Sequence, residues 1–493
     1  LTGDGGPLDP AEKKHLTEFE IRNNWRLACK VRIIEDITIE IPGVHGGTDR
    51  KKDLIMFPEG FSPDLWPLDK NNKKVYGVAF DIGTTTVVGM LWDLTTGKPV
   101  HAAARTNPQS VFGADVISRI MFSGQEEGNL SLLQQKVLDC LHEILIEFEN
   151  TEGVAPSHIL KATVVGNTTM SHLFLGINPG SLARSPFEPA FRGPVTVNAE
   201  KLGFAINSRG LVHVLPNIAG HVGSDITGVL LASGLRALDG ANLAIDIGTN
   251  GEILLSYNDK VLTCSTAAGP AFEGASIHQG MRATTGAIES VRIQNGDVEL
   301  SVIDDATPIG ICGSGLIDSA AEMLTYGIIT KKGRMLNKEE ARKIGLADGI
   351  INRLSTGNNG NEFILFKGKG GNNIAINQKD IREVQLAKGA ISSGISIMMD
   401  RLGIKAEDLR QVLLAGAFGN YINKGSALTI GLLPRISEEK VISIGNAAGV
   451  GACMALLSQS AKGHANLLAE ETEHVDLAAH PDFQDTYLKA MYF

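Results

Sequence analysis

The sequence predicts an α/β protein made of two similar halves. Residues 78–86, which read VAFDIGTTT, are echoed by residues 243–251, which read LAIDIGTNG. Each copy is a short apolar run, typical of a buried strand, that ends in an Asp and a tight turn of glycine and small polar residues. A second observation is the alternation of strand-like and helix-like segments from Val75 onward. The alternation favours sheets covered by helices, and the repeat indicates that the arrangement occurs twice.

Hydrophobic periodicity predicts the individual elements, with short apolar or alternating runs for strands and a period of about 3.6 residues for helices. The predicted strands cover residues 76–81, 88–93, 160–165, 211–215, 243–247, 252–256 and 411–415. The predicted helices cover residues 114–123, 130–149, 222–236, 313–327, 380–402 and 447–459. A predicted hairpin followed by strand–helix units occurs in both halves, so we expect a duplicated fold.

The N-terminal part of the chain, before Val75, lies outside the region of alternating strand-like and helix-like segments. A helix-like stretch at 12–23 precedes a segment at 31–41 in which isoleucines alternate with polar residues, as in a half-buried strand. Residues 43–74 contain glycines, prolines and a polar run, which predicts a linker. We therefore divide the chain into a fragment at 1–42, a linker at 43–74, a first half at 75–240 and a second half at 241–493.

The composition narrows the classes of partner. The chain has 493 residues, of which 43% are hydrophobic and 20% charged, as in a globular protein of several domains. The net charge is −10 and Lys and Arg form no block, so nucleic acid is not an expected partner. No apolar run reaches the ~18 residues of a membrane helix and no signal peptide opens the chain, so we expect no membrane association and a cytoplasmic location. The cysteines form no CxxC pair and fit reduced thiols; they are Cys29, Cys140, Cys264, Cys312 and Cys453.

The two repeated turns carry residue types that bind phosphate. Glycine lets the backbone approach an anion, hydroxyl and amide groups donate hydrogen bonds to it, and an aspartate can hold a metal ion or its water. We therefore expect Asp81 and Asp246 to act on one nucleotide. The turn residues are Gly83, Thr84 and Thr85 in the first copy and Gly248, Thr249, Asn250 and Gly251 in the second.

Further glycine turns follow predicted strands. They comprise Gly166, Asn167 and Thr168, then Gly416, Ala417 and Phe418, and finally Gly445 before a helix of small residues. Asn and Thr in the first of these turns fit either a helix cap or a hinge. Residues 269–274 and 310–315 are either cofactor-facing turns or ordinary loop turns. The sequence contains no GxxxxGK followed by Ser or Thr, and no GxGxxG that opens a helix after a strand, which excludes P-loop and Rossmann sites.

In this order the elements resemble the actin-like ATPase superfamily, which includes sugar and acetate kinases, heat-shock chaperones and actin. The resemblance implies a duplicated ribonuclease H-like fold with two lobes that bind ATP and Mg²⁺ between them. It makes the repeated turns phosphate loops, Asp81 and Asp246 catalytic carboxylates that hold Mg²⁺ through water, and residues 416–418 an adenosine loop under the base. It also places residues 166–168 and Gly445 beside the cofactor.

A closer resemblance starts from residues 25–29, which read WRLAC and precede an acidic and hydrophobic strand. This segment looks like the end of a plant-type ferredoxin domain, whose last cysteine, here Cys29, ligates a 2Fe–2S cluster. A ferredoxin tail, a linker and an actin-like ATPase together resemble the reductive activators of corrinoid proteins. The other three cluster cysteines would precede residue 1, so we expect Cys29 to be an orphaned ligand and this chain to bind ATP and Mg²⁺ but no cluster.

This resemblance implies an activity and a partner. Such enzymes use ATP to drive an electron onto inactive cob(II)alamin, which becomes cob(I)alamin, in a corrinoid protein. That partner is a corrinoid iron–sulfur protein or the corrinoid subunit of a methyltransferase. ATP would shift the populations of two complexes through its different affinity for each. A homodimer is the preferred oligomer.

Three alternatives use the same fold. A small-molecule kinase would need a catalytic base, for which Asp225 is the candidate. A nucleotide-regulated chaperone or scaffold would bind ATP without turnover that a partner stimulates. An activator of radical dehydratases would carry its cluster cysteines inside the ATPase body, where Cys264 and Cys312 lie in contexts that do not match that class. The kinase and the chaperone leave the ferredoxin-like segment unexplained.

Overall fold

The computed structural model describes Pro7, Ile21, Arg26 and residues 57–58, 60–68, 74–357, 360–419 and 421–493. The chain divides into two compact units, residues 1–46 and 47–493. The fragment expected at 1–42, with Cys29, and most of the linker expected at 43–74 lie outside the described residues. The described part of the second unit contains two six-stranded sheets and two three-stranded sheets.

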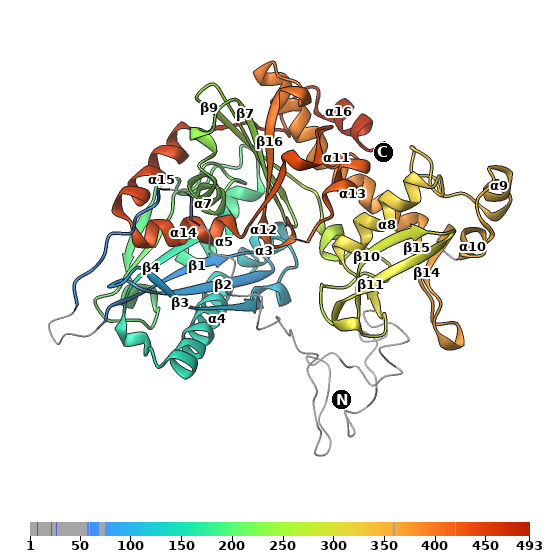
Figure 1. Cartoon of the computed structure of the whole chain (residues 1–493). Coiled ribbons are helices and arrows are strands. Elements are labelled where there is room, and N and C mark those ends of the chain that lie inside the picture. The colour runs from blue at the N-terminus through green and yellow to red at the C-terminus, as the bar shows by residue number, and fades with distance from the viewer. Residues whose placement is uncertain are drawn as a thin grey trace. The chain divides into compact units, whose positions relative to one another are not determined.

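The first six-stranded sheet is formed by strands between residues 76 and 214 (Figure 1). Its order is β3-β2-β1-β4-β6-β5, with β1 antiparallel to β2 and parallel to β4. Helix α4 (Asn129–Glu152) packs on it through an apolar stripe that includes Leu141 and Phe148. The strands are β1 (Tyr76–Ile82), β2 (Thr86–Asp93), β3 (Lys98–Thr106), β4 (Ile159–Gly166), β5 (Val195–Asn198) and β6 (Leu211–Val214).

The second six-stranded sheet repeats this topology. The path β9-β8-β7-β16-β17 matches β3-β2-β1-β4-β6, because each has an antiparallel meander followed by two strands parallel to the meander's first strand. Helix α11 (Gln378–Leu402) packs on β8 and β9. The duplication confirms the predicted actin-like α/β fold. The strands are β7 (Ala241–Ile247), β8 (Gly251–Tyr257), β9 (Lys260–Thr266), β16 (Leu409–Ala415), β17 (Val441–Gly445) and β18 (Glu473–His474).

Two helices, α7 (Ser224–Ser233) and α14 (Ala447–Leu457), share one apolar core with both large sheets (Figure 1). Helix α14 contacts β1 and β4, and the same core contains Ala244 of β7 and Leu254 of β8. The helices cross at glycines, because a side chain at Gly451 would come within 3.0 Å of the Gly228 carbonyl oxygen. The small residues after Gly445 therefore allow the two halves to pack closely.

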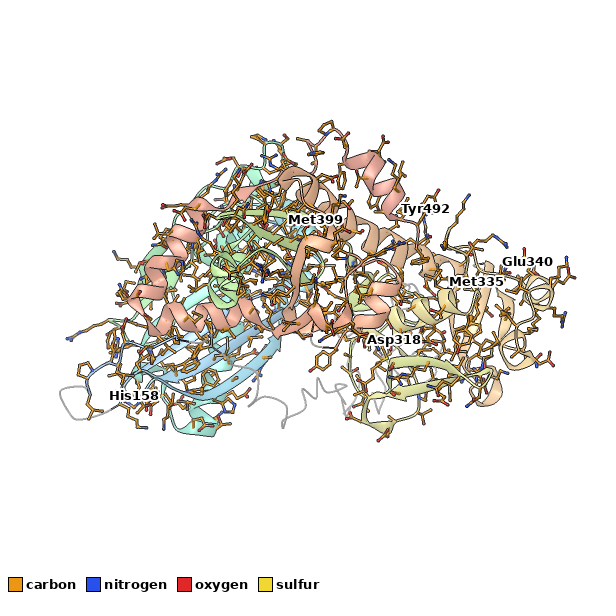
Figure 2. All side chains as sticks on the ribbon, turned by 45° about the horizontal axis from the view of Figure 1, so that its top comes forward. His158, Asp318, Met335, Glu340, Met399 and Tyr492 are labelled. Carbon is orange, nitrogen blue, oxygen red and sulfur yellow. The ribbon has the colours of Figure 1, made fainter. Side chains whose placement is uncertain are left out.

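An inserted segment between β9 and α11 carries the two three-stranded sheets, β11-β10-β12 and β13-β14-β15. Figure 2 shows Asp318, Met335 and Glu340 on this segment. The sequence predicted only its helix, which is α8 (Gly313–Thr325). The other elements are β10 (Ala287–Gln294), β11 (Asp297–Val302), β12 (Gly310–Ile311), α9 (Lys338–Lys343), α10 (Asp348–Ile351), β13 (Leu354–Gly357), β14 (Gly360–Phe366) and β15 (Ile374–Asn377).

The predicted ends of elements differ from the observed ends by a few residues. The helix expected at 222–236 is α7, which begins after Gly223 and ends before Gly234, a glycine in the left-handed conformation. In the described part of the chain, no helix is both long and apolar enough to cross a membrane. The remaining helices are α3 (Val116–Ser123), α5 (Thr168–Leu175), α6 (Ala199–Leu202), α12 (Gly416–Gly419), α13 (Lys424–Thr429), α15 (Gln459–Glu471) and α16 (Phe483–Ala490).

Candidate nucleotide site

Asp81 and Asp246 lie near the ends of equivalent strands in the two large sheets. Asp81 lies beside Val165 of β4, and Asp246 lies beside Ala415 of β16. Burial and the charge of Asp246 raise the pKa of Asp81 to about 7, and burial raises the pKa of Asp246 to about 6. The structure therefore brings the two predicted carboxylates within electrostatic range of each other.

Two more acidic side chains complete a carboxylate cluster, which comprises Asp81, Asp225, Asp246 and Glu252. Asp225 lies in the first turn of α7, and burial with the charges of Asp246 and Asp81 raises its pKa. Glu252 lies opposite Asp246 in the β7–β8 hairpin, and burial with the charges of Asp225 and Asp246 raises its pKa. So many like charges disfavour full ionisation unless a cation joins them.

The cluster fits a cation that keeps water in its coordination shell. In the part of the chain that the structure describes, no three acidic, histidine or cysteine side chains form a group that could hold a metal ion directly. Mg²⁺ usually retains several waters and binds through one or two carboxylates together with phosphate oxygens. The donor set therefore agrees with water-mediated contacts to Mg²⁺.

Hydrogen bonds from neighbouring residues fix the backbone carbonyl groups of the first repeated turn. Asn107 donates from Nδ2 to the Gly83 carbonyl and from its backbone N to the Thr85 carbonyl, both at 2.8 Å. Between them, the Thr84 carbonyl accepts from Nη2 of Arg119 at 2.5 Å. Because three consecutive carbonyl oxygens bind to the protein, an anion at this turn would meet donors rather than carbonyl oxygens.

Arg119, on α3, was not predicted as a site residue, because a single arginine in a helix has no distinguishing sequence pattern. It is 0% exposed and also donates to the Gly113 carbonyl at 2.8 Å and to Oε1 of Gln109 at 3.2 Å. Burial lowers its pKa to about 10, so it is protonated at neutral pH. Its buried charge lies directly behind the turn and favours an anion in front of it.

The second repeated turn is closed by a hydrogen bond of 2.9 Å from Gly248 N to the Asn250 carbonyl. Gly416, which follows β16, lies against this turn with φ of +83°. A Cβ atom at Gly416 would come within 3.0 Å of Oδ1 of Asp246. Gly251 is also confined, since a Cβ there would lie 2.7 Å from Ile391. Because glycine has no side chain, Gly416 leaves room for the Asp246 carboxylate and Gly251 leaves room for the helix that carries Ile391.

The turn after β4 combines two functions. Asn167 caps α5 with Oδ1 and donates from Nδ2 to Oγ1 of Thr84 at 2.9 Å, so it connects Gly166 and the strand end to the first repeated turn. Thr168 is 1% exposed, and its hydroxyl donates to the Ala219 carbonyl at 2.7 Å. Thr168 is therefore almost completely buried, and its predicted cofactor contact stays a prediction.

The predicted adenosine loop contains the short helix α12. The ring of Phe418 stacks on that of Phe272, with centroids 5.8 Å apart and planes 9° apart. The side chain of Ala417 lies outside the described residues. Phe418 therefore packs against the segment at 269–274, whose sequence fits either a cofactor-facing turn or an ordinary one.

Gly445 ends β17 with φ of +63°, and the next residue joins the two halves. Asn446 caps α14 by accepting from Gly449 N at 2.8 Å. Its side chain also hydrogen-bonds to Asp81 and opposes the rise in the pKa of that carboxyl. Asn446 was not among the predicted site residues, although its position after a strand and before a helix of small residues is a usable signal.

Glu273 joins the two repeated turns and was also missed. Its Oε2 accepts from Oγ1 of Thr85 at 3.0 Å, and its Oε1 accepts from Oγ1 of Thr249 at 2.5 Å. The residue lies in a one-turn 3₁₀ helix, Pro270–Glu273. No local pattern in the sequence relates it to threonines in two distant turns.

The described cysteines do not support an internal iron–sulfur site. Cys140, Cys264, Cys312 and Cys453 are free and buried. Burial raises the pKa of Cys264, and Cys312 donates to the Ile288 carbonyl at 3.3 Å. Neither of the two candidates for a radical-dehydratase activator presents an exposed thiolate, which argues against that alternative.

The duplicated sheets and the paired turns define the ASKHA class of ATPase folds. Residues 240–493 match the family described as the C-terminal domain of RACo, the ASKHA domain, and residues 76–237 match the RACo middle region. The chain belongs to the RACo family, the reductive activators of corrinoid proteins, and the predicted family is thereby confirmed.

Three relatives illustrate this membership. The chain is 40% identical over 429 residues to the corrinoid activation enzyme RamQ of Eubacterium limosum, which covers 86% of this chain and 71% of RamQ. It is 25% identical over 447 residues to the Co(II) methylated amine-specific corrinoid protein reductase of Methanosarcina barkeri, with 84% and 76% covered. A solved structure of a reductive activator for corrinoid, iron-sulfur protein superposes with a TM-score of 0.75 at 38% identity, over 85% of this chain and 66% of that structure.

Proposed function

We propose that this chain is an ATP-dependent reductive activator that returns a corrinoid protein from cob(II)alamin to cob(I)alamin. The observation that carries the proposal is the convergence of two phosphate-type turns, one from each duplicated sheet, on one carboxylate cluster. Two relatives are named for their action on corrinoid proteins or for corrinoid activation. We infer a partner of the same kind, either a corrinoid iron–sulfur protein or the corrinoid subunit of a methyltransferase.

The site residues would share the binding of Mg·ATP. Mg²⁺, when bound, would neutralise negative charge on the phosphates. Asp81 and Asp246 would accept hydrogen bonds from water molecules on the cation. The hydroxyls of Thr85 and Thr249 and the N–H groups of the glycine turns would donate to the phosphates. Phe418, in the short helix α12 after β16, would lie beside the adenine.

Nucleotide binding would change the affinity for the corrinoid protein by changing how the two halves are arranged. The two turns belong to different sheets, and α7 and α14 connect those sheets at a close crossing. Phosphates bound by both turns would favour one arrangement of the halves. A ligand changes an equilibrium only through its different affinity for the two states, so ATP and ADP would set different affinities for the corrinoid protein.

The proposal is tested by ATP hydrolysis with Mg²⁺, alone and with a corrinoid protein in the cob(II) state. We expect the partner to stimulate hydrolysis in the wild-type chain and in Asp485→Ala, which changes an exposed acidic residue on α16. We expect Asp246→Ala to abolish the stimulation. Phosphate transfer to an added sugar or acid, without stimulation by the corrinoid protein, would instead favour the kinase alternative with Asp225 as the base.

The proposal also includes the domain boundary, the location, the oligomeric state and the role of Cys29. The division of the second unit at residues 240 and 241 is supported by the start of β7 at Ala241. A cytoplasmic location is supported by the free thiols of the four described cysteines. The homodimer and the role of Cys29 as an iron–sulfur ligand come from the family resemblance alone.

A further inference from the structure

One carboxylate ties the two phosphate-type turns together. Glu273 accepts a hydrogen bond from Thr85 of the first turn at 3.0 Å and from Thr249 of the second at 2.5 Å. The side chain is half-buried, and each of its oxygen atoms binds one hydroxyl. These two contacts connect segments on the two duplicated sheets, so the carboxylate bridges the halves at the site itself.

The turn that carries Glu273 has a glycine at each end and is closely packed at Gly274. Gly269 and Gly274 flank it with φ of +76° and +79°. A Cβ atom at Gly274 would lie 2.7 Å from the backbone N of Met281, so the chain there is tightly confined. The preceding residue, Phe272, stacks on Phe418 of the predicted adenosine loop. The same short turn therefore contacts the adenosine loop and both phosphate turns.

A terminal phosphate and the Glu273 carboxylate would need the same donors. A threonine hydroxyl has one hydrogen and can donate it to one acceptor at a time. Both hydroxyl hydrogens are at present directed to the carboxylate. A phosphate at this place would also carry the same sign of charge as the carboxylate, so the two cannot occupy the position together without repulsion.

We propose that Glu273 is a positioning residue that latches the two phosphate turns together until the terminal phosphate of ATP displaces it. The inference rests on the proposed function, because it takes both turns as phosphate loops. ADP lacks the terminal phosphate and leaves the latch in place. ATP must break both hydrogen bonds and put its phosphate in the place of the carboxylate, so the contact between the halves depends on the nucleotide.

The latch lowers the affinity for ATP relative to ADP. A hydrogen bond to a charged acceptor contributes tenfold or more in an equilibrium constant, so removal of the carboxylate should strengthen ATP binding by about tenfold. A structural role that only supports the fold would instead change the binding of both nucleotides together. The ratio of the two affinities therefore separates the latch from a general effect on the site.

The experiment compares the dissociation constants of a non-hydrolysable ATP analogue and of ADP, each with Mg²⁺, by isothermal titration calorimetry on the full chain. For Glu273→Ala we expect about tenfold tighter binding of the ATP analogue and ADP binding within about twofold of wild type. Glu273→Gln keeps the shape without the charge and should shift the ratio in the same direction by a smaller factor; it carries the test if the alanine variant does not fold. Glu299→Ala, an exposed change on β11, should alter neither constant.

Two results would overturn the latch in different ways. If wild type binds both nucleotides and the variants leave the ratio unchanged, or weaken ATP alone, the latch is wrong and the proposed function stands. If wild type binds neither nucleotide, the proposed function and the latch fail together.

Discussion

Replacement of Gly416 by alanine would show whether nucleotide binding depends on the placement of Asp246. Gly416 follows β16 with φ of +83°, and a methyl group there would come within 3.0 Å of Oδ1 of Asp246. Real Cβ atoms essentially never lie that close to another heavy atom, so the carboxylate or the strand end must move. Because Asp246 belongs to the carboxylate cluster, this displacement would act directly on the proposed Mg²⁺ contacts.

The loss of stability in Gly416→Ala has two contributions, and a matched variant at another glycine separates them. A left-handed conformation costs an alanine about 1–2 kcal/mol of folding free energy, and this cost applies equally at Gly403, which ends α11 with φ of +66° and has no neighbour within 4 Å of the new methyl group. At Gly416 the steric overlap adds about 1–3 kcal/mol. We therefore expect Gly403→Ala to lose about 1–2 kcal/mol of stability, and Gly416→Ala to lose roughly 2–5 kcal/mol.

The assays are urea unfolding for stability and calorimetric titration with Mg·ATP for affinity. Gly403→Ala should bind Mg·ATP like wild type, whereas Gly416→Ala should bind it at least about tenfold more weakly, because a small misplacement of a site group is costly. The reasoning is refuted if both variants fold and bind Mg·ATP equally well. Asp246 would then have no role that depends on its present position.

Three other changes are expected from the contacts. In the absence of nucleotide and Mg²⁺, the melting temperature should fall as the pH rises from about 4 to about 7. The pKa values of Asp81 and Asp246 are raised, so the folded state holds protons that the unfolded chain has lost. A melting temperature that rises over this range would contradict the burial of these carboxyls. Arg119→Met should lower the unfolding free energy by about 2–4 kcal/mol in urea, since it leaves buried carbonyls unpaired; a change below about 0.5 kcal/mol would contradict this. Gly451→Ala, at the crossing of α7 and α14, should lower the free energy of unfolding by about 1–3 kcal/mol. Gly463→Ala, in an open part of α15, should raise it by about 0.5–1 kcal/mol. Equal effects of the two variants in calorimetry would argue against a close crossing.

The repeat in the sequence predicted two similar α/β halves, and the resemblance to actin-like ATPases predicted their fold. Two copies of one strand-and-turn pattern, at domain-scale separation, indicated two equivalent sheets, and the observed strand orders have this relation. The pairs Asp81 with Asp246 and Gly166 with Gly416 occupy equivalent places because they lie at or directly after the ends of equivalent strands. Local periodicity was informative here because these strands are buried and their turns are rich in glycine.

The site residues that the sequence did not predict depend on contacts between distant segments. Arg119 binds a carbonyl 35 positions earlier in the chain, and Glu273 binds a threonine 188 positions earlier. Neither residue has a local pattern that distinguishes it from an ordinary charged side chain. The short strands of the inserted segment were missed for a different reason: β11, for example, is exposed or half-buried along its whole length, and its short amphipathic pattern gives little signal.

The central claim is that the nucleotide sets the affinity of this chain for a corrinoid protein. The most direct measurement is the dissociation constant for a cob(II) corrinoid protein, by surface plasmon resonance or calorimetry, with Mg·ADP and then with a non-hydrolysable ATP analogue and Mg²⁺. We predict values that differ by about tenfold or more between the two nucleotides, which corresponds to about 1.4 kcal/mol of coupling, and no difference in Asp246→Ala. Equal dissociation constants with both nucleotides, at saturating nucleotide, would contradict the account, because a nucleotide without differential affinity cannot drive the partner toward reduction.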